Sequence, residues 1–146
     1  MKIAGRPACR DNMKLTKTEK DFLQYQRVAR MASVDSNGVA HNVPVCPLVD
    51  KDKIYFGTER KARKLRNIQA NPSVTVVFDE YTEAWSFLRG VMVQGTGRVV
   101  NKKEFQELRK KIYSKFSQYE SNAPLGERDS VIVEVTPTRK FSWGLE

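Results

Sequence analysis

The chain has 146 residues, which is the size of a single domain with a substantial buried core. Hydrophobic residues make up 40% of it, a content typical of a packed globular protein and too high for a disordered chain. With 26 Lys and Arg against 17 Asp and Glu, the net charge of +9 favours an anionic partner: a phosphorylated cofactor, a nucleic acid or a phosphorylated substrate.

The sequence gives no indication of a membrane span, a secretion signal or a metal site. No apolar run approaches the roughly 20 residues of a membrane-spanning helix, and the first residues lack the apolar core of a signal peptide. Cys9 and Cys46 have neither metal nor redox spacing, so we expect both to stay reduced in the cytoplasm, with Cys46 packed inside. The single histidine, His41, cannot form a histidine-based metal cluster.

The N-terminal third predicts an arm, a helix and a hairpin. Residues 1–15 lack periodicity and are expected to form an arm before a single domain over residues 16–146. A capping box over residues 16–19 opens a short helix. Residues 28–34 then alternate as a strand does, and the turn over residues 35–38 ends in Asn-Gly, which favours a hairpin because both residues tolerate positive φ.

The second strand of this hairpin is expected to run from Val39 to Val49. It contains Pro44 and Pro47, neither of which can donate a hydrogen bond to a neighbouring strand. Such prolines belong on a sheet edge, at a bulge or where another molecule covers the strand.

The segment from Ile54 to Pro72 predicts a phosphate site. An aromatic-rich strand ends in Gly57-Thr58, and a short helix follows and stops at Asn71. A helix N-terminus presents unpaired N–H groups and a partial positive charge, so cations placed there favour phosphate binding. Near its start the helix is expected to carry five cations, although a solvated basic face would have the same pattern: Arg60, Lys61, Arg63, Lys64 and Arg66.

The second half predicts more strands and one amphipathic helix. A buried strand covers residues 73–79, and a long strand covers residues 85–100, with bends at Gly90, Gly95 and Gly97. A capping-box-like start at Asn101 opens a helix with one apolar stripe, formed by Phe105, Leu108, Ile112 and Phe116. After a loop over residues 121–129, we expect two final strands, over residues 130–136 and, beyond Pro137, 139–143.

This order of elements predicts a mainly β protein with helices, in the α+β class. Tight turns join most strands, so the sheet should be largely antiparallel. A long strand bent at glycines, with helices at the sheet edges, favours a barrel with helical decoration.

Several short segments follow one another in a recognisable order: residues 30–34, 37–45, 55–58, 63–64, 71–72, 89–95, 131–137 and 141–143. Their succession resembles the FMN-binding split-barrel family, of which pyridoxamine 5′-phosphate oxidase is the best-known member. The resemblance implies an antiparallel split β-barrel and a homodimer that holds FMN in two clefts at the subunit interface.

The resemblance also implies which residues contact the cofactor. The strand from Asn42 to Pro47 would lie along the flavin ring and offer it backbone groups, and the corner after Phe56 would hold the ribityl phosphate. The region around Gly90, together with Trp143, would come from the other subunit and cover the flavin. The implied cofactor-binding residues are Asn42, Val43, Pro44, Val45, Gly57, Thr58, Arg63, Lys64 and Trp143.

Two departures separate this chain from the oxidase proper. The oxidase has an Arg-Leu-His-Asp-Arg-like segment after its tryptophan, whereas this sequence stops at Glu146, and Gly90 stands where the oxidase has glutamine. We therefore expect a relative of the oxidase that does not oxidise pyridoxine phosphate. The expected function is a cytoplasmic FMN-dependent oxidoreductase acting with a small-molecule substrate or electron donor, and no side chain is identified as its catalytic acid or base.

Other interpretations stay open at this point. The same fold could hold a deazaflavin coenzyme or haem in place of FMN. A protein of another class, a non-catalytic basic nucleic-acid-binding protein, would use the aromatic and basic residues around Tyr113 and Tyr119, although an amphipathic helix explains these better. His41 is expected to be a partly buried hydrogen-bonding residue, with a proton-donor or substrate contact near the flavin as the alternative.

Overall fold

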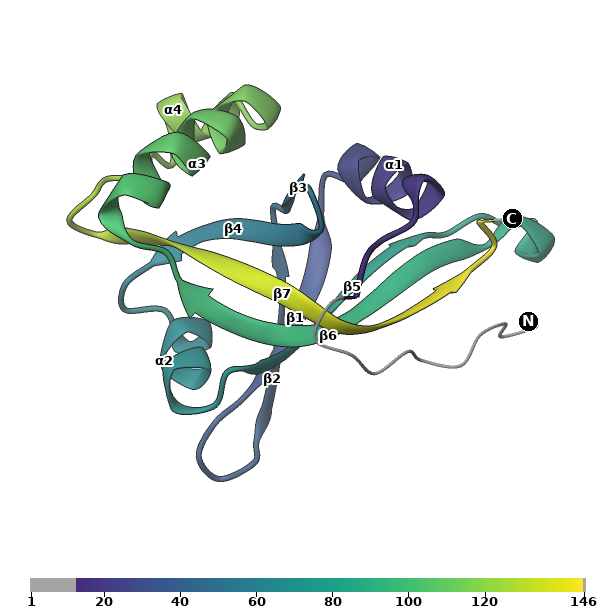
Figure 1. The fold of residues 1–146 in the computed structure, drawn as a ribbon, viewed down its shortest axis with the longest axis horizontal. Coiled ribbons are helices and arrows are strands. Elements are labelled where there is room, and N and C mark those ends of the chain that lie inside the picture. Colours follow the sequence, from purple (N-terminus) through teal and green to yellow (C-terminus); the bar gives the residue numbers. More distant parts are fainter. Residues whose placement is uncertain (1–12, 146) are drawn as a thin grey trace.

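The computed structural model describes residues 13–145. Its strands form one antiparallel sheet in the order β2-β1-β5-β6-β7-β4-β3 (Figure 1). In chain order the elements are α1 Lys17–Tyr25, β1 Ala29–Val34, β2 Ala40–Val45, β3 Leu48–Asp50, β4 Lys53–Glu59, α2 Arg63–Ala70, β5 Ser73–Glu80, the 3₁₀ helix η1 Trp85–Phe87, β6 Arg89–Val99, α3 Lys102–Lys115, α4 Gln118–Asn122 and β7 Ser130–Trp143.

The two edge strands of the sheet, β2 and β3, follow one another in the chain, so the sheet must curl. Only Cys46 and Pro47 separate β2 from β3, yet these strands are the two edge strands. This curled antiparallel sheet is the split barrel that the sequence predicted. The prediction of one strand from Val39 to Val49 is wrong, because the chain leaves β1 after Val45 and pairs with β4 from Leu48 onward.

Strands β6 and β7 form the longest pairing in the sheet and contain a bulge. The register shifts between Gln94 and Gly95, opposite Pro137, as the predicted bend at Gly95 requires. The prediction of two final strands is wrong, since β7 runs unbroken from Ser130 to Trp143. Pro137 is tolerated inside β7 because it lies at the bulge, where its missing N–H costs no regular ladder bond.

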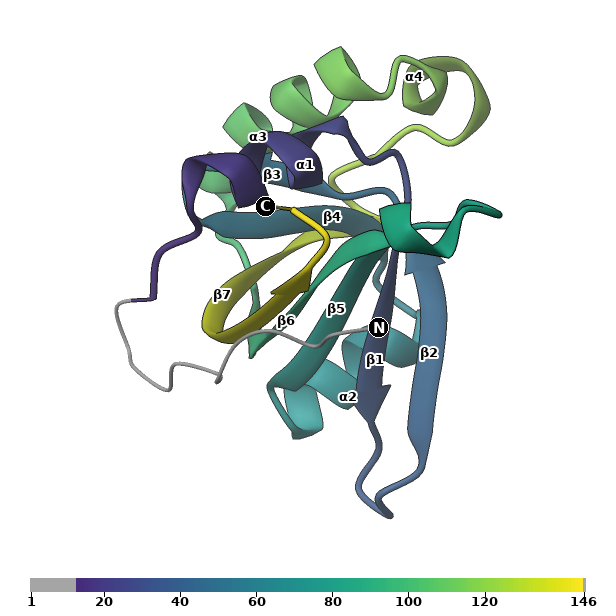
Figure 2. The same cartoon turned by 90° about the vertical axis from the view of Figure 1, so that its right-hand side faces the viewer.

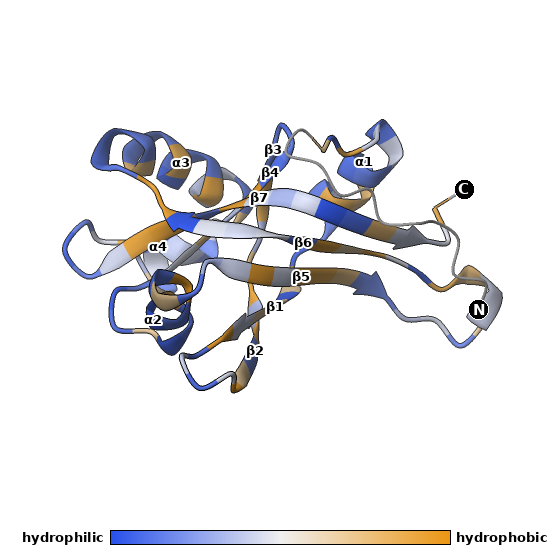
Figure 3. Ribbon diagram, turned by 60° about the horizontal axis from the view of Figure 1, so that its bottom comes forward, coloured by the Kyte–Doolittle hydropathy of each residue, from blue (hydrophilic) through white to orange (hydrophobic). Residues whose placement is uncertain are grey.

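Two apolar clusters lie on opposite faces of the curled sheet. The larger one fills the barrel and includes the fully buried Met31, Phe56 and Phe78. The smaller one lies between β3, β4 and β7 and the helix α3, whose predicted stripe is buried as expected. Figure 2 shows α3 above β4 and α2 beside β1, and Figure 3 shows apolar residues along the strands with polar residues on turns and helices.

Both predicted capping boxes are present. The Thr16 hydroxyl accepts the Glu19 N–H, and the Glu19 carboxylate accepts the Thr16 N–H. Asn101 and Glu104 make the same reciprocal pair at the start of α3. These caps satisfy N–H groups that the first helical turn cannot.

The structure differs from the predicted turns in two places. At the hairpin tip only Gly38 has a positive φ, of 78°, because the Asp35 side chain accepts the N–H groups of Asn37 and Val39 and holds the loop as an Asx turn. The long strand does not begin at Trp85, where the short helix η1 forms instead. Most of the predicted arm lies outside the described residues, but Leu15 is buried in the larger core.

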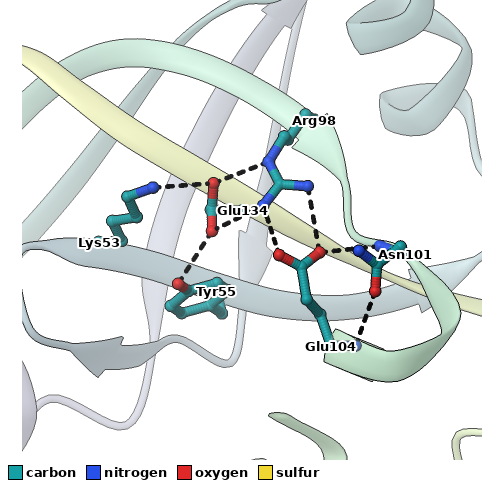
Figure 4. Close-up of polar contacts among 6 residues, drawn as sticks. All are labelled: Lys53, Tyr55, Arg98, Asn101, Glu104 and Glu134. Atoms are coloured by element: carbon teal, nitrogen blue, oxygen red, sulfur yellow. Dashed lines mark hydrogen bonds and ion pairs between the residues drawn. The ribbon is translucent and has the colours of Figure 1, made fainter. Parts of the chain in front are cut away.

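A buried carboxylate ties β4, β6 and β7 to the start of α3 (Figure 4). Glu134 is 4% exposed and accepts hydrogen bonds from Tyr55 Oη at 2.9 Å, Arg98 Nε at 2.9 Å and Lys53 Nζ at 3.2 Å. Arg98 also donates to both carboxylate oxygens of Glu104. Because each carboxylate oxygen of Glu134 has a donor, we assign this network to stability and not to a binding site.

Candidate functional site

The main candidate site is the corner where β4 ends. A cavity of 670 Å³ opens there, within the range of small-molecule pockets. Two segments far apart in the chain form its walls: the corner from β4 to α2, and the stretch from α4 to β7. Its lining residues are Gly57, Thr58, Glu59, Arg60, Lys61, Ala62, Lys64, Tyr119, Ala123, Pro124, Leu125, Arg128, Asp129 and Ser130.

The start of α2 lacks the features that normally stabilise the N-terminus of a helix. Its N-cap residue is Ala62, which makes no side-chain cap, and its first turn has no acidic residue. Arg63 and Lys64 occupy that turn instead, where each cation opposes the helix dipole by about 0.3–1 kcal/mol. A bound anion would reverse the sign of this interaction and accept the free N–H groups of the turn.

Lys64 and Thr58 are the best-placed of the predicted phosphate ligands. Both line the cavity, with Thr58 buried and Lys64 half-buried. Within residues 13–145 neither the Thr58 hydroxyl nor the Lys64 ammonium takes part in a hydrogen bond or an ion pair. Arg63 precedes Lys64 in the first turn but is exposed and does not line the cavity.

Two of the cations expected on the helix lie before it. The helix α2 begins at Arg63, so Arg60 and Lys61 belong to the turn that leaves β4. The Arg60 guanidinium donates to the carbonyls of Arg128 at 2.7 Å and Glu127 at 3.0 Å. Arg60 therefore fixes the opposite wall of the cavity, a role that the sequence did not indicate.

Gly57 lines the cavity, but another side chain also explains the glycine. A Cβ atom on Gly57 would lie 2.7 Å from Leu125, which is buried over β4. It is therefore the segment before β7 that approaches the backbone of Gly57 closely. Sequence reasoning missed Leu125 and the rest of this wall, since residues 121–129 have no periodicity that would connect them to β4.

The predicted flavin-ring residues lie on the edge strand β2. Val43 and Val45 point to the same side as the buried Met31 of β1, whereas Asn42 and Pro44 are exposed on the other side. Within the described residues β2 pairs only with β1, so its outer backbone groups are available to a ligand or to a second chain. His41 is half-buried, and its Nδ1 is a buried atom without a hydrogen-bond partner in residues 13–145.

Trp143 and the phosphate corner lie at opposite ends of the chain's sheet. Thr58 pairs with Val131 at the start of β7, and Trp143 lies twelve residues further along that strand. At about 3.3 Å per residue, the two are separated by about 40 Å along the strand. Trp143 instead packs on Gly90, where any Cβ atom would collide with the indole ring, and its ring lies 5.8 Å from that of Phe141. Figure 1 shows α2 and the last part of β7 toward opposite ends of the molecule.

The curled sheet and the basic corner agree with a family match over nearly the whole chain. The family described as pyridoxamine 5′-phosphate oxidase matches residues 15–144, so the chain belongs to that family. Among curated proteins it is similar to the 5a,11a-dehydrotetracycline/5a,11a-dehydrooxytetracycline reductase of Streptomyces rimosus. The two are 25% identical over 145 residues, which cover 92% of this chain and 86% of the reductase.

Similar solved structures share the fold. A FAD-binding protein from Mesorhizobium loti is 19% identical with a TM-score of 0.71, covering 90% of this chain and 97% of that one. A protein named F420 reductase is 21% identical with a TM-score of 0.70, covering 86% and 98%. HutZ, the haem storage protein from Vibrio cholerae, is 17% identical with a TM-score of 0.71, covering 86% and 91%. Some similar chains are longer, and this chain spans 55% of one of them.

Residues 13–145 were compared with the requirements of a membrane span and of a metal site. No helix within residues 13–145 has both the length and the apolar content to cross a lipid bilayer. The same residues contain no cluster of His, Cys, Asp and Glu side chains suited to a metal ion. Cys46 is a free, half-buried cysteine rather than a fully packed one, and Cys9 lies outside the described residues.

Proposed function

We propose that this protein is an oxidoreductase that binds FMN and works as a homodimer with the cofactor at the subunit interface. The observation that carries the proposal is the uncapped, basic start of α2 beside a 670 Å³ cavity. A helix start of this kind is unfavourable alone and becomes favourable when it binds a phosphate. The proteins named FAD-binding protein and F420 reductase are similar in fold and support a flavin-type ligand.

In this proposal Lys64, Arg63 and the Thr58 hydroxyl bind the ribityl phosphate, with Gly57 beside it. Hydrogen bonds to a charged group contribute about 1.5–3 kcal/mol each. Three of them would supply a large part of the roughly 8 kcal/mol that micromolar affinity requires. Arg60 and Lys61 add positive potential without direct contact, since the Arg60 guanidinium is already bound to two carbonyls.

The edge strand β2 would hold the flavin ring through its outer backbone groups, along Asn42, Val43, Pro44 and Val45. Pro44 fits this role because a ligand, unlike a neighbouring strand, does not require an N–H at every position. Bound FMN supplies hydride or electron transfer, while the protein positions the ring and shields it from water. The half-buried His41 lies on the same side of β2 as Val43 and Val45, and its unpartnered Nδ1 is not assigned a catalytic role here.

The distance between Trp143 and the corner is the reason to propose a shared cleft. Because twelve residues of β7 separate the two, we infer that one FMN molecule takes them from two different chains. A second copy, related by a two-fold axis, can place its Gly90 and Trp143 over the first copy's flavin. The outer face of the sheet offers an apolar row for this contact, formed by the half-buried Val77, Met92 and Phe141, which are neighbours across β5, β6 and β7.

The protein would react with a small-molecule substrate or electron donor. We expect it to act in the cytoplasm. The reductase from Streptomyces rimosus supports reduction of an organic substrate as the reaction class, without identifying the substrate of this chain. A deazaflavin coenzyme is the second candidate cofactor, favoured by the similarity to the protein named F420 reductase. Its phosphate could use the same basic corner. The haem alternative has support only from the similarity in fold to HutZ.

The phosphate assignment is tested by titrating the purified chain with FMN and with riboflavin, which lacks the phosphate. We expect riboflavin to bind at least tenfold more weakly than FMN, which is about 1.4 kcal/mol. Lys64→Met should weaken FMN binding at least tenfold and leave riboflavin binding unchanged. Lys103→Met, an exposed lysine on α3, is the matched control and should change neither affinity.

Equal affinity of wild type and Lys64→Met for FMN would refute the phosphate assignment. Replacing FMN with a deazaflavin coenzyme in the same titration separates the two cofactor candidates. Light scattering should show a dimer, and a monomer that keeps full FMN affinity would contradict the shared cleft.

A further inference from the structure

A second cavity lies where α4 meets the connection between β2 and β3. Its volume is 390 Å³, within the range of small-ligand sites, and its lining is mainly apolar. It adjoins the phosphate cavity, with which it shares Tyr119 and Ala123. We call it the Phe116 cavity after one of its lining residues, which are Arg27, Cys46, Phe116, Gln118, Tyr119, Asn122 and Ala123.

Two cations flank the Phe116 ring. Arg27 Cζ lies 4.6 Å and Lys115 Nζ lies 5.2 Å from the ring centroid. Arg27 Nη1 donates to the Lys115 carbonyl at 2.9 Å, and Lys115 Nζ donates to the Pro47 carbonyl at 2.7 Å. These contacts hold both cations in place beside the cavity.

Neither cation is neutralised by the protein. Within residues 13–145 no carboxylate lies within ion-pair distance of Arg27 or Lys115, although one other lysine of α3, Lys111, pairs with Asp50 at 2.7 Å. Burial, and then the neighbouring Arg27, lower the pKa of Lys115 to about 8, while the Cys46 thiol opposes this shift. Burial chiefly, with help from Cys46, raises the pKa of Tyr119 to about 12, so Tyr119 stays neutral beside them.

An apolar cavity with one unpaired cation, Arg27, in its wall and a second, Lys115, beside the same Phe116 ring has the features of a site for an amphiphilic anion. The apolar walls exclude a strongly hydrated ligand such as free phosphate, because they offer it few hydrogen bonds. The two cations favour a negatively charged ligand over a neutral one, since charge-assisted hydrogen bonds are about twice as strong as neutral ones. Size, apolarity and charge thus point to one chemical class.

We propose that the Phe116 cavity binds a small aromatic or branched carboxylate, with its apolar body against Phe116 and Tyr119 and its carboxylate between Arg27 and Lys115. This site is distinct from the proposed FMN site and does not depend on it. It gives the protein a second ligand, whose head group neutralises Lys115.

Binding to this site is linked to the protonation of Lys115. A bound carboxylate favours the charged ammonium, so it raises the pKa of Lys115 and binds most tightly when Lys115 is protonated. Affinity is therefore full well below pH 8 and falls as the pH rises through 8. The ionisable groups around Lys115 are Arg27 and Cys46, and Tyr119 beside Cys46 stays neutral across this range.

The test is calorimetric titration of the full chain with 2-naphthoate and, as a neutral probe of the same shape, 2-naphthamide. We expect naphthoate to bind at least tenfold more tightly than naphthamide at pH 6.5. Lys115→Met should abolish this preference, whereas Lys110→Met, an exposed lysine on the same helix, should keep it. Naphthoate affinity should be unchanged in saturating FMN, because none of the proposed phosphate ligands lines the Phe116 cavity.

Equal affinities for the two probes, or an equal effect of the two lysine variants, would overturn the proposal. Competition between naphthoate and FMN would also overturn it, by assigning naphthoate to the phosphate corner. Should Lys115→Met fail to fold, Gln118→Trp provides the second variant, because residue 118 is exposed, lines this cavity and not the phosphate cavity, and a large side chain there blocks entry. A Gln118→Trp protein that binds naphthoate as wild type does would refute the site.

Discussion

The buried carboxylate of Glu134 gives the sharpest prediction about stability. Glu134→Gln keeps the shape of the side chain and removes the charge that attracts Lys53 and Arg98. Hydrogen bonds to a charged group contribute about 1.5–3 kcal/mol, and breaking a buried ion pair costs about 3–5 kcal/mol. The side chains of Lys53 and Arg98 are 43% and 49% exposed, so water screens part of the loss. We therefore expect Glu134→Gln to lower the free energy of unfolding by about 2–3 kcal/mol.

Urea denaturation followed by tryptophan fluorescence measures this change. With a slope of about 1.5–2 kcal/mol per molar urea, the midpoint should fall by about 1–2 M while the slope stays constant. Glu107→Gln, on the exposed face of α3, is the matched control and should shift the midpoint by less than about 0.3 M. If the two variants unfold at the same urea concentration, the network of Figure 4 does not stabilise the protein.

Three further predictions concern pH, close packing and capping. Burial alone would raise the pKa of Glu134, but hydrogen bonds led by that from Arg98 outweigh it and hold the pKa below its ordinary value of 4.5. Its stabilising contribution should thus be complete above pH 4.5 and decline as the pH falls through the folded-state pKa; acid titrations in which wild type and Glu134→Gln lose stability in parallel would contradict this. Gly90→Ala should cost about 1–3 kcal/mol and alter the fluorescence of Trp143, because the new methyl group collides with the indole ring; an unaltered melting curve and spectrum would argue against this packing. Asn101→Ala should cost about 1 kcal/mol in the same urea assay, since it removes the cap of α3, and Lys102→Ala next to it should cost little.

The sequence was most informative where the signal was local. The capping boxes that start at Thr16 and Asn101 depend on residues three positions apart, so they could be identified directly and were confirmed. The same holds for the apolar stripe of α3 and for the order of the motifs, which predicted the split barrel and the family. Local patterns were less reliable at the prolines, where Pro47 separates two strands and Pro137 does not, because only the neighbouring strand decides whether a missing N–H matters.

The candidate site was only half predictable for a related reason. The corner formed by Thr58, Arg63 and Lys64 is continuous in sequence, and the structure brings Thr58 and Lys64 to one cavity. The opposite wall comes from residues 119–130, whose approach depends on Leu125 packing over Gly57 and on Arg60 binding two distant carbonyls. Hydrophobic periodicity cannot predict such contacts, because they join segments that are far apart in the chain.

What the sequence determined by itself was most of the helices and strands, their family and the basic corner, because hydrophobic period, capping and charge act between near neighbours in the chain. What only the tertiary structure decided was which strand ends face one another. The separation of Trp143 from the corner follows from the pairing of β4 with the start of the unbroken strand β7, and the pair of unneutralised cations around Phe116 results from the curl of the sheet. That curl joins residues many positions apart, and the free energy of such contacts depends on the packing of the whole barrel.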